Sequence, residues 1–115
     1  MNVTLYHYPR CSKSRETLAL LRGRGIEPEI IEYLKTPPTT AELEAILAKL
    51  GLEPRELLRK GEAAYQEAGL DDPNLDRAAV IAAIVRHPVL MERPIVVTDE
   101  KARIGRPPER VLEIL

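Results

Sequence analysis

The sequence predicts an α/β domain with a small mixed β-sheet, and two observations lead to this prediction. Short apolar runs rich in β-branched residues alternate with longer segments whose apolar residues recur at helical spacing. The 115 residues suffice to bury roughly two-thirds of the surface of the extended chain without disulfides or metal ions. We therefore expect a single domain over residues 1–115, with a core of Leu, Ile, Val and Ala because Phe and Trp are absent.

A β-α-β unit is predicted for the first third of the chain. Residues 3–6 form a short β-rich run, and residues 12–24 have the composition of a helix that ends at Gly25. A second strand is expected at residues 28–33. A unit of this length should form a right-handed parallel crossover.

The middle of the chain is predicted to be helical. Thr40-Ala41-Glu42-Leu43 is typical of a helix start after the Pro37-Pro38 break, and the apolar spacing continues to Leu50. Shorter helices are expected at residues 53–60 and 77–86, and these segments should pack as one cluster. The apolar face of the last helix is expected to consist of Ala78, Ile81, Ala82 and Val85.

The chain is predicted to return to β-structure near its end. Residues 93–98 are the most strand-like segment, and residues 102–105 follow a short turn, so an antiparallel hairpin is expected. Pro107 and Pro108 then open a final helix. Its inward-facing residues should be Val111, Leu112 and Leu115.

Cys11, the only cysteine, lies between the first strand and the first helix. A helix start offers unpaired N–H groups and partial positive charge, and His7, Arg10, Lys13 and Arg15 add positive potential, all of which favour thiolate. A small buried hydrophobe is the alternative, but the charged and hydroxyl neighbours disfavour it. Without a second cysteine, any oxidised form of Cys11 must be resolved by an outside thiol.

Charge and composition exclude several classes of function. The chain has 17 basic and 18 acidic residues, which gives no global field for nucleic acid or a membrane surface. No apolar run approaches membrane-spanning length, no leader pattern precedes the first strand, and one unpaired cysteine fits a reducing cytosol, so a cytoplasmic protein is expected. His7 and His87 form no ligand motif with Cys11, so no metal site is predicted.

Four blocks of sequence resemble the glutaredoxin-coupled arsenate reductase (ArsC) family. They occur in order along nearly the whole chain, and the family implies a thioredoxin-like fold with a helical insertion between the β-α-β unit and the hairpin. The activity implied is reduction of arsenate to arsenite, with glutathione as co-substrate, glutaredoxin as partner and no tightly bound cofactor. The blocks are residues 6–15, Tyr33-Leu34-Lys35-Thr36-Pro37-Pro38, Leu57-Leu58-Arg59-Lys60 and residues 87–97.

The resemblance also implies a set of site residues. Arg59, Arg93 and Arg106 are expected to surround the thiol of Cys11, because forked guanidinium donors match the oxygens of a tetrahedral oxyanion. His7 and Ser14 are expected to help hold the sulfur as thiolate. Thioredoxin-like folds place a cis-proline opposite the cysteine, and the match assigns that position to Pro94. The alternative is that these residues are surface charges and an ordinary trans-proline.

Other functions remain open at this stage. A regulatory relative that binds RNA polymerase is typically recognised by a Cys-x-x-Cys switch, but Ser14 occupies the second position here. A reductase-like relative with another substrate has an altered arginine set, whereas the Leu-Leu-Arg-Lys block is retained here. A non-redox anion-binding or scaffold domain would leave Cys11 incidental.

Overall fold

The computed structural model describes residues 2–115 and divides the chain into two compact units. The first unit comprises the residues up to Thr36 together with Arg93–Leu115, and the second comprises Pro37–Glu92. Each unit is described separately below, and the expectation of one domain over residues 1–115 stays a prediction.

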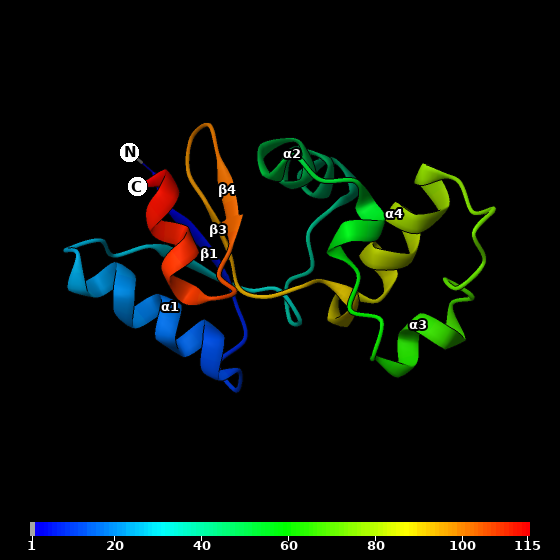
Figure 1. Ribbon diagram of the computed structural model, residues 1–115, viewed down its shortest axis with the longest axis horizontal. Coiled ribbons are helices and arrows are strands. Elements are labelled where there is room, and N and C mark those ends of the chain that lie inside the picture. The colour runs from blue at the N-terminus through cyan, green and yellow to red at the C-terminus, as the bar shows by residue number, and fades with distance from the viewer. Residues whose placement is uncertain (1) are drawn as a thin grey trace. The chain divides into compact units, whose positions relative to one another are not determined.

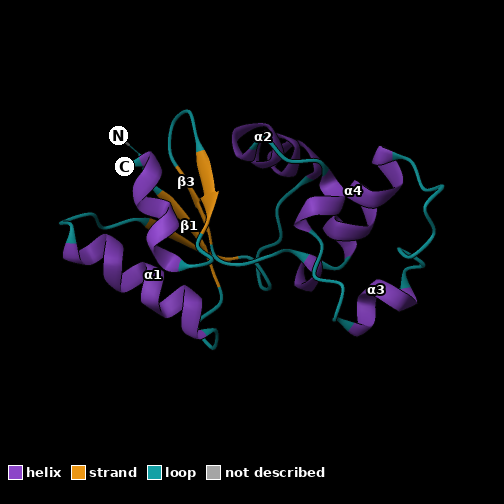
Figure 2. Ribbon diagram, viewed as in Figure 1, coloured by secondary structure: helices purple, strands orange, loops and turns teal. Residues whose placement is uncertain are grey.

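The first unit contains a four-stranded sheet in the order β2-β1-β3-β4 (Figures 1 and 2). Strand β1 (Thr4–His7) pairs in parallel with β2 (Glu29–Glu32) and antiparallel with β3 (Ile95–Val97). Strand β4 (Ala102–Ile104) completes the predicted antiparallel hairpin with β3. The mixed sheet confirms the predicted fold class.

Two helical segments pack in the first unit against the sheet and each other. Helix α1 (Ser12–Gly23) follows β1, and Gly25 has φ of +76°, which confirms the predicted helix stop. A 3₁₀ segment, η3 (Pro108–Ile114), contacts both α1 and β4. Their shared core consists of Val3, Leu5, Leu21, Val96, Val111 and Ile114.

The second unit consists of short helices, as predicted for an insertion between β2 and β3. Helix α2 (Thr40–Leu50) begins with a capping box between Thr39 and Glu42, and α4 (Arg77–Arg86) packs against it. Between them lie η1 (Pro54–Leu57) and α3 (Ala63–Glu67), and η2 (Pro88–Leu90) follows α4. Among the buried residues are Leu43, Ile46, Leu47, Leu57, Val80, Ile84 and Leu90.

Three details of the helical predictions were wrong. Helix α4 buries Val80, Ile81, Ala83 and Ile84, whereas Ala78 and Ala82 are exposed. The segment expected as a helix over residues 53–60 is a single 3₁₀ turn, η1. The final helix is also 3₁₀, and its buried residues are Pro108, Val111 and Ile114, with Leu112 and Leu115 only partly buried.

The peptide bond between Arg93 and Pro94 is cis, which confirms the expectation for Pro94. The bond between Arg106 and Pro107 is also cis, and the sequence analysis did not anticipate it. No helix in the described part of the chain, residues 2–115, has the length and apolar character needed to cross a bilayer.

Gly105 directly follows β4 and packs against Pro94, the residue that precedes β3. Its N–H donates a hydrogen bond to the carbonyl oxygen of Pro94 at 2.8 Å. A Cβ atom at this position would lie 2.7 Å from Thr17 Oγ1 and 2.8 Å from Pro94 Cγ. Thr17 is fully buried and the proline ring is stiff, so there is no room for a methyl group.

We predict that Gly105→Ala lowers the free energy of unfolding by about 1–3 kcal/mol, because overpacking forces the neighbours to shift. Gly23→Ala is the matched control, since a Cβ atom at Gly23 would have no atom within 4 Å and alanine is the better helix former. Urea denaturation of both variants measures the difference. Equal stability of the two variants would contradict the close packing around Gly105.

Candidate active site

Cys11 is the residue immediately before α1, at the end of the loop that follows β1. Its backbone is extended, with φ −88° and ψ 124°, and its carbonyl oxygen accepts the N–H of Arg15 at 3.0 Å. Its own N–H donates to the carbonyl oxygen of Tyr8 at 3.0 Å, which closes the loop as a tight turn. The half-buried thiol therefore lies at the helix start, as the sequence predicted.

The environment lowers the pKa of the Cys11 thiol below its ordinary value. Burial alone would raise this pKa, but hydrogen bonds from the Ser14 N–H, the Arg93 guanidinium, the Lys13 N–H and the Ser14 hydroxyl outweigh burial. The donors at the start of α1 and one arginine thus act together on one sulfur. The thiolate, which is the nucleophilic form, is favoured.

Ser14 is fully buried and connects the sulfur to the loop. Its Oγ accepts the N–H of Tyr8 at 3.4 Å. A hydroxyl has a single proton, and once the oxygen accepts from Tyr8 that proton is available to the Cys11 sulfur. Ser14 therefore orients the loop and contributes to the lowered pKa of Cys11, in line with its predicted supporting role.

The strand register brings Arg93 and Arg106 to Cys11. Tyr6 pairs with Ile95, so the end of β1 lies beside the start of β3, where Arg93 is located. Ile95 also pairs with Ile104, so the residues that follow β4 lie at the same end of the sheet as the residues that precede β3. Arg106 Nη2 lies 3.9 Å from Cys11 Sγ, and Arg106 Nε donates to the carbonyl oxygen of Arg93 at 2.8 Å.

Arg93 is half-buried, and its guanidinium lies 4.8 Å from the centre of the Tyr8 ring. Burial opposes its charge, but the Tyr33 hydroxyl and the Cys11 sulfur more than compensate, so the pKa of Arg93 is raised. Its Nε and Nη1 are buried and have no hydrogen-bond partner among residues 2–115. A guanidinium with two buried, unpaired donor atoms therefore lies beside the thiol.

The contact of Tyr8 with Arg93 was not found by the sequence reasoning. Tyr8 lies within the Cys11 block, but no spacing rule links a ring in the first loop to an arginine before β3. Only the pairing of β1 with β3 brings the two together. Tyr8 is therefore a structural partner of the predicted arginine.

His7 is the last residue of β1 and is only 6 % exposed. Burial lowers its pKa, and Arg22 and Arg15 lower it further, whereas Glu32 raises it. The lowered pKa favours the neutral imidazole, so His7 adds less positive charge near Cys11 than a charged histidine would. Its supporting role stays a prediction.

Arg59 belongs to the second unit and is the second residue after the η1 segment. Its guanidinium forms ion pairs with Glu62, at 3.3 Å, and with Glu92, at 3.8 Å. Its N–H donates to the carbonyl oxygen of Leu90 at 2.7 Å, which fixes the backbone. Its role beside Cys11 stays a prediction.

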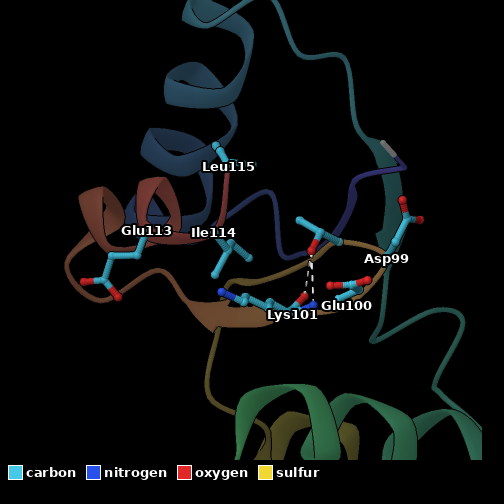
Figure 3. Close-up of a pocket in the computed structure, with 7 residues that line it drawn as sticks. Asp99, Glu100, Lys101, Glu113, Ile114 and Leu115 are labelled. Carbon is cyan, nitrogen blue, oxygen red and sulfur yellow. Dashed lines mark hydrogen bonds between the residues drawn. The ribbon is translucent and has the colours of Figure 1, made fainter.

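Two other features of the described chain are its potential metal ligands and a pocket away from Cys11. No group of three or more His, Cys, Asp or Glu side chains within residues 2–115 could hold a metal ion. A pocket of about 520 Å³ lies at the β3–β4 turn and the C-terminal residues (Figure 3). It is lined by Asp99, Glu100 and Lys101 from the turn, where Thr98 and Lys101 are hydrogen-bonded, and by no predicted site residue.

We predict that Ser14→Ala raises the pKa of Cys11, because the thiolate loses one hydrogen bond. At a pH below that pKa, the thiolate fraction and thus the alkylation rate should fall about threefold to fivefold. The rate of reaction with iodoacetamide, followed from pH 4 to 9, measures this. Ser12→Ala is the matched control, since Ser12 is an exposed serine of the same helical turn. Superimposable profiles for the two variants would refute the role of Ser14.

Comparison with known proteins supports the resemblance found in the sequence. The sequence model of the ArsC family matches residues 6–114. The uncharacterized protein YfgD of Escherichia coli is 56 % identical, over 98 % of this chain and 96 % of its own length. An arsenate reductase of Neisseria meningitidis serogroup B is 49 % identical, over 98 % of this chain and 97 % of its own.

Solved structures agree with the sequence relatives. The structure of an arsenate reductase from Vibrio cholerae superimposes with a TM-score of 0.97 at 53 % identity, covering 100 % of this chain and 98 % of that one. This likeness confirms the predicted thioredoxin-like fold with its helical insertion. Because the family model and close relatives all extend over nearly the whole sequence, the chain belongs to the ArsC family.

Proposed function

We propose that this protein is an arsenate reductase in which Cys11 is the nucleophile and glutathione and glutaredoxin supply the electrons. The observation that carries the proposal is the placement of one thiolate-favouring sulfur at the start of α1 beside the guanidinium groups of Arg93 and Arg106. The arsenate reductases among its relatives support arsenate as the oxyanion.

Arsenate is a tetrahedral oxyanion whose paired oxygens match forked guanidinium donors. Arg93 supplies one such guanidinium, which bonds to the Cys11 sulfur, and the neighbouring Tyr8 ring holds it from one side. Arg106 adds Nη2, while its Nε is tied to the Arg93 carbonyl. We include Arg59 as a third arginine, whose ion pairs with Glu62 and Glu92 would have to yield in part to the anion.

The first step is attack by the Cys11 thiolate on arsenic. A sulfur–arsenic bond forms, an arsenic–oxygen bond breaks, and the oxygen leaves as hydroxide or, after protonation, as water. The oxidation states of arsenic and sulfur do not change in this step. The arginines position the oxyanion and offset its repulsion from the thiolate, which are contributions that act mainly by orientation and electrostatics.

The following steps reduce arsenic from the pentavalent to the trivalent state. Glutathione attacks the arsenylated enzyme, two electrons pass to arsenic as a disulfide forms between Cys11 and glutathione, and arsenite leaves. Glutaredoxin then removes the glutathione from Cys11 and regenerates the thiolate. Overall, arsenic acid and two glutathione molecules give arsenous acid, glutathione disulfide and water. The absence of a second cysteine makes the outside thiol necessary and fits a reducing, cytoplasmic location.

We predict that Cys11→Ser abolishes arsenate reduction while the far-ultraviolet circular dichroism and the unfolding midpoint stay close to those of the wild type. Serine is nearly isosteric, but it cannot form the sulfur–arsenic bond or the mixed disulfide. Arsenite production with glutathione and glutaredoxin measures the loss. Substantial residual reduction by this variant would eliminate the mechanism, and wild-type activity with thioredoxin alone would overturn the electron route.

We predict that Arg93→Lys and Arg106→Lys each lower kcat/KM for arsenate by about 10²-fold, because lysine replaces a fork with a point charge. The same substitution at Arg59 tests its proposed role. Arg103→Lys is the control, since Arg103 lies in the same unit but pairs with Glu113 at 2.9 Å. Unchanged kcat/KM in the Arg93 and Arg106 variants would argue against an oxyanion site at Cys11.

A further inference from the structure

A pocket of about 370 Å³ opens beside the loop that carries Cys11. This volume lies within the range of small-molecule sites. Four of its lining residues come from the end of β1 and the loop, and three come from the end of β2 and the chain that follows it. They are His7, Tyr8, Pro9 and Arg10, and Glu32, Leu34 and Lys35, all within the first unit.

The pocket carries two cations and one carboxylate. Arg10 and Lys35 are exposed, and Lys35 Nζ lies 3.5 Å from Glu32 Oε1. An ion pair with this exposure contributes little to stability, so its charges can exchange partners with a ligand at low cost. The pocket thus suits a ligand with two negative groups and one positive group.

His7 supplies an independent indication of a ligand. Its side chain lines the pocket, is only 6 % exposed, and has no hydrogen-bond partner for Nδ1 among residues 2–115. A buried polar atom without a partner costs free energy, which a bound molecule can recover by hydrogen bonding to it. A polar ligand in this pocket would supply that partner.

Tyr8 lines the pocket and also contacts two residues of the proposed active site. The Tyr8 ring lies against the guanidinium of Arg93, and the Tyr8 carbonyl accepts the N–H of Cys11. Pro9 and Arg10, which also line the pocket, directly precede Cys11. A molecule bound there lies against the loop that directly precedes Cys11.

We propose that this pocket binds glutathione, the thiol substrate of the reaction proposed above, on which this inference rests. Glutathione has two carboxylates and one ammonium group, which match the two cations and the carboxylate. Arg10 and Lys35 bind its carboxylates, and Glu32 binds its ammonium group. The bound thiolate displaces hydroxide from arsenic on Cys11, and the Cys11–glutathione disulfide forms as arsenic accepts two electrons and arsenite leaves.

Binding is tested directly with S-methylglutathione, which keeps the three charges but cannot react. Titration of the wild-type protein, followed through backbone amide shifts, should move the signals of residues 7, 8, 10 and 32–35. Double substitution Arg10→Gln with Lys35→Gln should weaken this binding by roughly tenfold, since two exposed ion pairs are lost. No shift at these residues in the wild type, or equal affinity in the double variant, would overturn the proposal.

Kinetics provide the second test. The double variant should raise KM for glutathione roughly tenfold, a larger effect than on KM for arsenate or on the rate with uncharged dithiothreitol. Arg24→Gln is the matched control, since Arg24 is an exposed arginine that follows the opposite end of α1 from Cys11. Glutathione diethyl ester lacks both carboxylates. With the wild type, its KM should be higher than that of glutathione. The double variant should have the same KM for the ester as the wild type has.

The outcomes separate this proposal from the proposed function. If the wild type reduces arsenate with glutathione and the double variant has the same KM for glutathione, the pocket assignment is wrong while the reductase stands. If the wild type binds S-methylglutathione at the pocket but reduces no arsenate with any thiol, the arsenate assignment is wrong and the pocket stands.

Discussion

The structure of the site depends on one sulfur held at the start of a helix by several hydrogen-bond donors. The loop between β1 and α1 is short, and Ser14 and the Tyr8 carbonyl fix it from both sides of Cys11. The sheet then places positive charge beside the sulfur. The antiparallel pairing of β1 with β3 and of β3 with β4 brings two arginines to the end of the sheet where Cys11 lies. Reactivity and topology are therefore joined, since a shift in strand register would remove the arginines from the thiol.

Much of this site could be predicted from the sequence because its central part is local. Cys11, His7 and Ser14 lie within eight residues, and a strand followed by a helix is enough to place a thiol at a helix start. Arg93 and Arg106 required the family resemblance, since their approach to Cys11 depends on strand pairing between distant segments. The Tyr8–Arg93 contact and the lowered pKa of His7 depend on side-chain packing and burial, which no motif encodes.

The errors in the helical unit have a tertiary cause. Residues 53–60 have helical composition, yet Leu58 forms a β-bridge with Met91, and Leu57 and Arg59 exchange backbone hydrogen bonds with Glu92 and Leu90. These long-range bonds replace those of a second helical turn, so η1 stops after one turn. In α4, apolar residues occupy most positions, so their spacing did not distinguish the buried face from the exposed one.

The hydrogen bond from Arg106 Nε to the Arg93 carbonyl ties the guanidinium of Arg106 to the main chain of Arg93. The place of the Arg106 guanidinium therefore depends on the path of the main chain at residue 93. Both arginines also approach the same sulfur, that of Cys11. Energetic effects at the two positions should accordingly not sum, as is usual for residues that share a partner. The two positive charges at this end of the sheet therefore act on Cys11 as one group.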